Sequence, residues 1–267
     1  MIQVISLGAG VQSTAMALMA AHGVVTPMPD CAIFADTQWE PKAVYEHLRW
    51  LSSGILPFPV HIISAGNLRA DTIAGFSKRA RSFAAVPWFM KMPNGDEAMG
   101  RRQCTSHYKI EPIHKKVREL LGYKPRQRIP ADSVEMWIGI SVDELIRATP
   151  SKVKWITKRF PLLEQRMNRA ECQGWLIGMG YPAAPKSSCI GCPFHSDHQW
   201  RTLRDKHPDE WQDAIAVDEA IRLQPGFKGE QYMHRSLVPL KNADLTTLED
   251  HGQLNMFNNE CEGMCGV

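Results

Sequence analysis

The chain has 267 residues and a mass of 30.1 kDa, enough for one large α/β domain or two small ones. Hydrophobic residues make up 44% of the sequence and charged residues 22%, a globular composition that excludes wholesale disorder. The seven cysteines are odd in number, and a chain of this size needs no disulfide bonds to hold its core. A secreted disulfide scaffold is therefore excluded as well.

The net charge of +3 hides a division along the chain. The segment Lys78–Arg169 holds 20 Lys and Arg against 9 Asp and Glu, a net charge of +11, whereas the remainder carries −8. A basic middle predicts that a polyanion docks there, either nucleotide phosphates or the backbone of tRNA or DNA. Solvated helix faces explain such a bias about equally well.

The sequence shows no membrane or targeting signal. No stretch approaches the ~20 apolar residues of a membrane-spanning helix. A signal peptide has Lys or Arg before its apolar run, and no Lys or Arg precedes the apolar run Met16–Ala21. We therefore expect a cytoplasmic protein with no membrane partner, in which thiols stay reduced and cysteines bind metal or do chemistry.

The expected elements alternate between strands and helices. A strand at Ile2–Leu7 meets the glycine turn Gly8–Gly10, after which Ser13–Ala21 has helical composition. Later strands are expected at 31–35, 59–63 and 134–140, helices at 41–51, 108–121 and about 209–223, and a hairpin around Pro93-Asn94-Gly95. This alternation predicts a doubly wound, mostly parallel α/β sheet, which binds ligands beyond the carboxyl ends of its strands.

The turn after the first strand has the composition of a phosphate-binding loop. Glycines let backbone N–H groups approach a phosphate closely, and the helix N-terminus adds a favourable dipole. Ser13 and Thr14 add hydroxyl donors. The turn has neither the Walker A ending nor the dinucleotide fingerprint, so an ordinary tight turn is the alternative.

The loop Gly8-Ala9-Gly10-Val11-Gln12-Ser13-Thr14 resembles the Ser-Gly-Gly-x-Asp-Ser loop of the PP-loop ATP pyrophosphatases, with Ala9 for the second residue and Gln12 for the aspartate. Within that superfamily the chain resembles the phosphoadenosine phosphosulfate (PAPS) reductase branch. The resembling pieces run in order from residue 1 to about 200: Phe34-Ala35-Asp36-Thr37, Arg102-Gln103-Cys104-Thr105, Lys109, Gly139-Ile140-Ser141-Val142-Asp143-Glu144, Arg147, Pro161-Leu162 and the segment from Lys186 to Phe194.

The resemblance implies an adenine nucleotide α-hydrolase-like fold that binds ATP or a PAPS-type nucleotide. Its nucleotide contacts would be Ser6, Gly8, Ala9, Gly10, Gln12, Ser13, Thr14, Asp36, Thr37 and Arg147. We expect residues 1–200 to form this nucleotide-binding domain, with a basic insertion around 78–130. Residues 201–267 would form a helical C-terminal extension ending in a cysteine-containing tail.

Four cysteines are candidate metal ligands. Cys189-x-x-Cys192 has a metal-ligand spacing, and Cys104 and Cys172 could complete a tetrahedral centre, although ordinary buried cysteines compete with this interpretation. The resemblance implies a [4Fe–4S] cluster held near Cys104 and by the later pair. Cys172 is then the fourth ligand, or one iron stays open to bind sulfide; zinc is the alternative.

The tail carries the last two cysteines, Cys261 and Cys265. Its Glu260-Cys261-Glu262-Gly263 loosely resembles the Glu-Cys-Gly segment that holds the catalytic cysteine of PAPS reductases. The two thiols are candidate nucleophiles, a redox or sulfur relay, or cluster ligands, and two uninvolved thiols are the alternative. Asp143 is a further catalytic candidate, because with Glu144 it could bind Mg²⁺ or position a nucleotide. An ordinary carboxylate pair at a helix start explains it nearly as well.

Three functions follow. The first is ATP-dependent adenylation and thiolation of a nucleic-acid or small-molecule acceptor, with a sulfur donor protein as partner. The second is a sulfonucleotide reductase in which Cys261 attacks the sulfate sulfur and a thiol reductant releases sulfite. The third is a non-catalytic nucleotide-binding module of a DNA-modification or defence system. Gln12 in place of the loop aspartate agrees with this interpretation.

Overall fold

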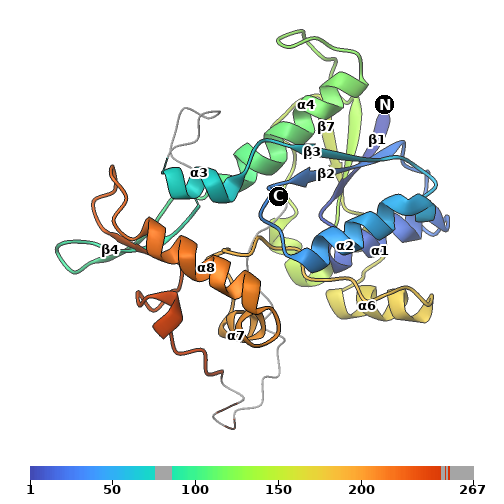
Figure 1. The fold of residues 1–267 in the computed structure, drawn as a ribbon. Coiled ribbons are helices and arrows are strands. Elements are labelled where there is room, and N and C mark those ends of the chain that lie inside the picture. Colours follow the sequence, from blue (N-terminus) through green and yellow to red (C-terminus); the bar gives the residue numbers. More distant parts are fainter. Residues whose placement is uncertain (76–85, 248–249, 251, 253–267) are drawn as a thin grey trace.

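The computed structural model describes residues 1–75, 86–247, 250 and 252. Its larger sheet has five parallel strands in the order β3-β2-β1-β6-β7 (Figure 1). The strands are β1 (Ile2–Leu7), β2 (Cys31–Asp36), β3 (Val60–Ser64), β6 (Val134–Ile138) and β7 (Ile156–Arg159). The predicted doubly wound parallel α/β sheet is confirmed.

Helices cover both faces of this sheet. One face carries α1 (Val11–Ala21), α2 (Lys42–Trp50), α5 (Pro161–Glu164) and α6 (Arg169–Gly178), and the other carries α4 (Glu111–Leu120). Successive strand residues alternate between the two cores, so Ile5 packs with α1 and Val4 packs with α4. Because both faces are buried, β2 is apolar almost throughout.

A third core lies beside the sheet. It is built by α3 (Leu68–Ala74), α7 (Asp197–Lys206) and α8 (Pro208–Ile221), together with Trp88 and Met233. These two residues flank strands of a three-stranded antiparallel sheet, ordered β5-β4-β8. Strands β4 (Phe89–Lys91) and β5 (Glu97–Met99) form the predicted hairpin, and β8 (Glu230–Tyr232) pairs with β4. Trp39 packs in this core, and its indole N–H donates to Asp213 Oδ2 at 2.7 Å. Described residues beyond 200, such as Asp213, are thus packed against residues that precede them by more than a hundred positions.

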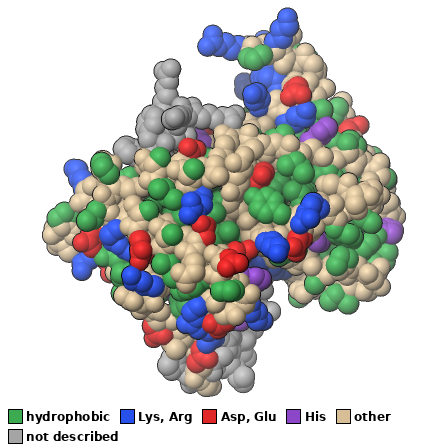
Figure 2. All heavy atoms as spheres, viewed as in Figure 1, with side chains coloured by type: hydrophobic (Ala, Val, Ile, Leu, Met, Phe, Trp, Pro, Cys, Tyr) green, Lys and Arg blue, Asp and Glu red, His purple; other side chains and the backbone are tan. Residues whose placement is uncertain are grey.

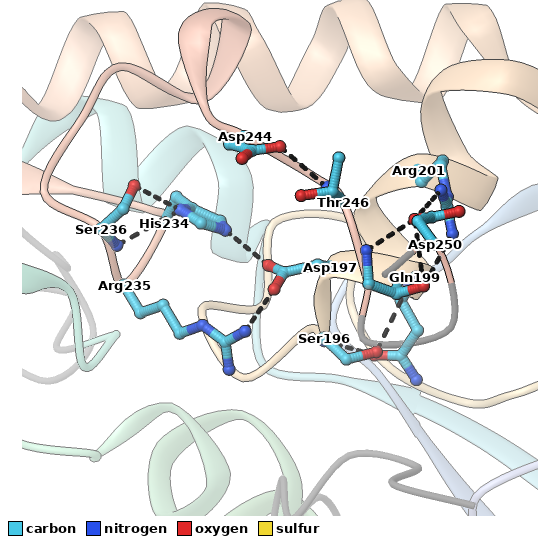
Figure 3. Close-up of polar contacts among 11 residues, drawn as sticks. Ser196, Asp197, Gln199, Arg201, His234, Arg235, Ser236, Asp244, Thr246 and Asp250 are labelled. Carbon is cyan, nitrogen blue, oxygen red and sulfur yellow. Dashed lines mark hydrogen bonds and ion pairs between the residues drawn. The ribbon is translucent and has the colours of Figure 1, made fainter. Parts of the chain in front are cut away.

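The N-terminal end of α7 anchors the segment that follows β8 (Figure 3). The Asp197 carboxylate contacts His234 Nε2 at 2.8 Å and also pairs with Arg235. Farther along the same helix, Arg201 pairs with Asp250 at 2.6 Å. These contacts hold His234, Arg235 and Asp250 against α7.

The sequence does not predict α3, α5, α6, α7 or β8, and three further elements differ from the expectation. Strand β7 is missed, because its four residues include the cations Lys158 and Arg159. The helix expected at 108–121 begins with a π-helical turn, Ser106–Ile110, before α4. The strand expected at 134–140 ends at Ile138. No helix within the described ranges is both long and apolar enough to cross a membrane.

Candidate nucleotide-binding site

A cavity of about 520 Å³ opens beside the carboxyl ends of β1 and β6. The chain runs outward from β1 to β2 and β3 and then returns to place β6 on the other side of β1. The strand order therefore reverses between β1 and β6, the position at which open α/β sheets bind ligands. The segment from Ser6 to Ser13, apart from Ala9, and the residues Gly139 and Ile140 line the cavity at this point.

The glycine turn has two backbone donors that converge on one oxygen atom. The N–H groups of Gly8 and Gly10 donate to the Ser13 hydroxyl oxygen at 3.2 and 3.3 Å. Ala9 between them has φ of 54°, in the left-handed region that favours glycine. Two amides aimed at one oxygen at the N-terminus of α1 are a geometry that also suits a phosphate or sulfate oxygen.

Two glycines let other segments approach this turn. A Cβ on Gly139 would lie 3.0 Å from the Ser13 nitrogen, and one on Gly10 would lie 3.0 Å from the Ser187 Cβ. The end of β6 and the segment from Lys186 to Ser188 therefore pack directly on the turn. Lys186 begins the resembling segment 186–194, for which the sequence predicts no nucleotide contact, and the structure places it in the cavity lining.

Cationic side chains dominate the polar wall. Glu144 supplies the one carboxylate among the described lining residues, whereas the cations are Lys109, Arg147, Lys152, Lys158, Arg169 and Lys186. Burial, followed by the nearby charge of Lys152, lowers the pKa of Lys158. This imbalance favours an anionic ligand, because a polyanion relieves the mutual repulsion of the cations.

Another part of the cavity lining is apolar. It contains Phe34, Ile113, Met136, Ile138, Ile140, Val153 and Ile156. His114 also lines the cavity, and burial, with a smaller effect from Lys158, lowers the pKa of its imidazole. An apolar wall beside converging cations suits a ligand with a flat ring at one end and anionic groups at the other.

Gln12 is held at the edge of this cavity by residues that follow β6. Its amide nitrogen donates to Ser141 Oγ at 3.4 Å and to Glu144 Oε2 at 3.3 Å. Glu144 also pairs with Arg147. Asp143, the residue predicted to be catalytic, is outside the cavity lining and accepts a hydrogen bond from the Arg169 backbone N–H at 3.2 Å. Glu144 is thus the carboxylate of this pair that faces the cavity.

The other predicted nucleotide contacts divide into two groups. Ser6, Gly8, Gly10, Gln12, Ser13 and Arg147 line the cavity, whereas Ala9, Thr14, Asp36 and Thr37 do not. The Thr14 hydroxyl is buried against His47 Nε2 at 3.0 Å. Asp36 accepts hydrogen bonds from the Gln38 backbone N–H at 2.7 Å and the Tyr45 hydroxyl at 2.8 Å. The structure brings six of these ten residues together around the cavity.

Three of the four candidate metal ligands lie near one another. Cys104, Cys189 and Cys192 line a second cavity of about 30 Å³, and Lys109 lines both cavities. The buried Glu40 carboxylate lies behind Cys189: its Oε1 is 3.6 Å from the Cys189 sulfur and 3.2 Å from Lys109 Nζ. Sequence reasoning missed Glu40, because its only signal was a position shortly after β2.

The described thiols do not fit an iron–sulfur cluster as they lie. A volume of about 30 Å³ corresponds to one water molecule's share of liquid, too little for a four-iron cube. Within the described part of the chain, no group of three or more His, Cys, Asp or Glu side chains is placed to hold a metal ion. The described residues therefore give no support to the cluster or to its zinc alternative, and both stay predictions from the sequence.

Cys172 lies apart from the other three cysteines. It is fully buried in the core that α6 shares with α1, and burial, followed by the charge of Asp143, raises the pKa of its thiol to about 12. Cys31 is buried in β2, as expected. Cys261 and Cys265, the predicted catalytic cysteines, lie outside the described residues.

No protein-family model matches the chain, and no curated protein matches it in sequence. Among solved structures, the fold is similar to that of phosphoadenylyl-sulfate (PAPS) reductase from Candida auris, determined as a phosphate complex. The sequence identity is 13%, the TM-score is 0.44, and the match covers 68% of this chain and 74% of that chain. A likeness at this level assigns no residue and no activity, so the site is defined by its own geometry.

Proposed function

We propose that this chain is an enzyme of the PP-loop, PAPS reductase-like kind that binds an adenine nucleotide and acts in sulfur transfer. The observation that carries the proposal is the cavity at the strand-order reversal between β1 and β6. It combines the glycine turn, an apolar wall and six cations in about 520 Å³. These parts match the phosphates and the purine ring of a nucleotide.

The position of three thiols near the nucleotide cavity supports a role in sulfur chemistry. Cys104, Cys189 and Cys192 line the small cavity, which shares Lys109 with the nucleotide cavity. A sulfur carried on this side of the molecule therefore lies next to the nucleotide site. Glu144 is the described carboxylate suited to share a Mg²⁺ ion with nucleotide phosphates, since Mg²⁺ is commonly held by one carboxylate and substrate oxygens.

The proposed reaction has two steps. A carbonyl-type oxygen of the acceptor attacks the α-phosphorus of ATP, the α–β phosphoanhydride bond breaks, and pyrophosphate leaves past the cationic wall. A cysteine persulfide supplied by a donor protein then attacks the activated carbon, and AMP leaves with the oxygen. A second thiol, oxidised in the process, reduces the resulting disulfide and leaves the sulfur on the acceptor.

Nucleotide binding is the first test. Titration calorimetry should show binding of ATP or PAPS in preference to GTP, and Arg147→Gln should weaken it by about tenfold or more, since a cation–phosphate contact is lost. Arg49→Gln is the matched control, because Arg49 is exposed on α2 and away from the cavity lining. Equal nucleotide affinities of the two variants would overturn the assignment of this cavity as the nucleotide-binding site.

The reaction class is tested separately. Sulfur transfer predicts AMP and pyrophosphate only when acceptor and sulfur donor are both present. Release of sulfite from PAPS or adenylyl sulfate without ATP would overturn thiolation in favour of the reductase. Nucleotide binding without either reaction would leave the non-catalytic module.

A further inference from the structure

A basic loop projects from the molecule between α4 and β6. It spans residues 121–133 and forms the green projection beyond the end of α4 in Figure 1. Figure 2 shows Lys and Arg side chains gathered on it. The stretch from 121 to 131 carries Lys124, Arg126 and Arg128 and contains neither Asp nor Glu. The three cations are exposed, and none makes an ion pair with another described residue.

The loop backbone is held in place from within. The Arg118 guanidinium of α4 donates to the carbonyl oxygens of Lys124 and Gln127 at 3.2 and 2.6 Å. The Lys124 backbone N–H donates to the Gln127 side chain at 3.0 Å, and Arg126 has φ of 67°. Arg118 thus stabilises the loop backbone, whereas the side chains of Lys124, Arg126 and Arg128 are exposed and available to contact a partner.

A second basic loop lies beside the first. It precedes β7 and carries Lys152 and Lys154, which are exposed and likewise have no ion pair within the described ranges. The Asp132 backbone N–H donates to the Lys154 carbonyl at 3.1 Å, and the Val134 N–H donates to the Trp155 carbonyl at 3.1 Å. The loops are therefore joined, and their five cations lie on neighbouring segments.

This surface leads to the nucleotide cavity. Lys152 belongs both to the second loop and to the cavity lining, and Lys158 lines the cavity a few residues farther along β7. Positive charge therefore continues from the tip of the projecting loop to the interior of the site. By contrast, Lys116 on α4 is neutralised by Glu119 at 2.7 Å.

We propose that the two loops form a docking surface for the phosphodiester backbone of a nucleic acid. Cations spaced along a ridge and free of carboxylate partners complement a chain of regularly spaced phosphates. The proposal rests on the proposed function in one respect: a nucleic acid docked here would present its acceptor base to the nucleotide cavity. Docking itself is measured without nucleotide.

The test uses fluorescence anisotropy with labelled 20-nucleotide RNA, single-stranded DNA and duplex DNA over a range of salt concentrations. Five phosphate contacts predict a slope of log K against log salt of about −3.5 for single strands. The triple variant Lys124→Ser, Arg126→Ser, Arg128→Ser should reduce the slope to about −1.4 and weaken binding by roughly tenfold or more at low salt. Comparing the three probes identifies the preferred nucleic acid.

The matched control removes three exposed lysines elsewhere, Lys42→Ser, Lys91→Ser and Lys206→Ser, on α2, β4 and α7. It should bind as the wild type does. An equal loss of nucleic-acid affinity in both triple variants would show that only the net charge of the protein matters. That result would overturn the docking surface. So would tighter binding to anionic lipid vesicles than to any nucleic acid, since that outcome identifies a membrane partner.

Nucleotide affinity separates this proposal from the proposed function. The three loop cations lie outside the cavity lining, so the loop variant should bind ATP or PAPS with unchanged affinity and melt at an unchanged temperature. Nucleotide binding without any nucleic-acid binding by the wild type overturns the docking surface alone. Nucleic-acid binding without nucleotide binding overturns the proposed function instead.

Discussion

At the scale of single residues, Gln12 stands where the resembled loop has aspartate, and its neighbours explain how an amide is accommodated. The side-chain nitrogen donates to Glu144 Oε2 at 3.3 Å, a contact that an ionised carboxylate could not make. Gln12→Glu keeps the shape but sets two carboxylates against each other, and should lower the free energy of unfolding by about 1 kcal/mol at pH 8. Urea unfolding should show the deficit shrinking below about pH 5, as one carboxylate protonates. A deficit independent of pH would contradict this account.

The thiol of Cys172 gives a second prediction at the same scale. With a pKa of about 12 against an ordinary 9.0, it holds about a thousandth of the thiolate of an exposed cysteine. Iodoacetamide at pH 8 should therefore leave Cys172 unmodified in the native protein and modify it in urea, as mass spectrometry of the peptides will show. Cys172→Ala should leave the iron and zinc content per chain unchanged. A lower metal content would make Cys172 a ligand after all.

At the scale of elements, the contact between the end of β6 and the glycine turn sets the shape of the phosphate loop. A Cβ on Gly139 would lie 3.0 Å from the Ser13 nitrogen and 3.1 Å from its Cα, so the turn must shift. Gly139→Ala should weaken nucleotide binding by about tenfold or more, because amides displaced from an anion lose strength quickly. Gly174→Ala is the control: Gly174 is exposed on α6 with open space around its Cβ, so the substitution should raise stability slightly without changing affinity. Equal nucleotide affinities for the two variants would refute the role of this contact.

Local sequence signals predicted some of these elements and could not predict the contacts between them. The run Cys31–Ala35 and the strand–glycine–helix start are local signals, so the parallel sheet and the position of the turn could be predicted. Lys152 and Lys158 reach the cavity only because the connection from β6 to β7 folds over it, and a contact made by tertiary packing leaves no local pattern. For the same reason the sequence could not show that Cys172 lies apart from the other thiols, because spacing along the chain does not indicate which core a helix joins.

At the scale of the whole molecule, a buried histidine ties global stability to pH. His47 lies in the core between α1 and α2, hydrogen-bonded to Thr14, and burial lowers its pKa from 6.5 to about 4. Between these values the unfolded chain binds a proton that the folded protein refuses, so stability falls as pH falls from about 6.5 towards 4.

This histidine should contribute roughly 2 kcal/mol to the loss of unfolding free energy between pH 7.5 and pH 5. His47→Gln keeps a polar partner for Thr14 and cannot titrate in this range, so its stability should depend less on pH by that amount. Urea unfolding of both proteins at the two pH values measures the difference directly. Parallel pH dependences would show that other groups control acid stability, and that His47 is already protonated or already solvated in the folded protein.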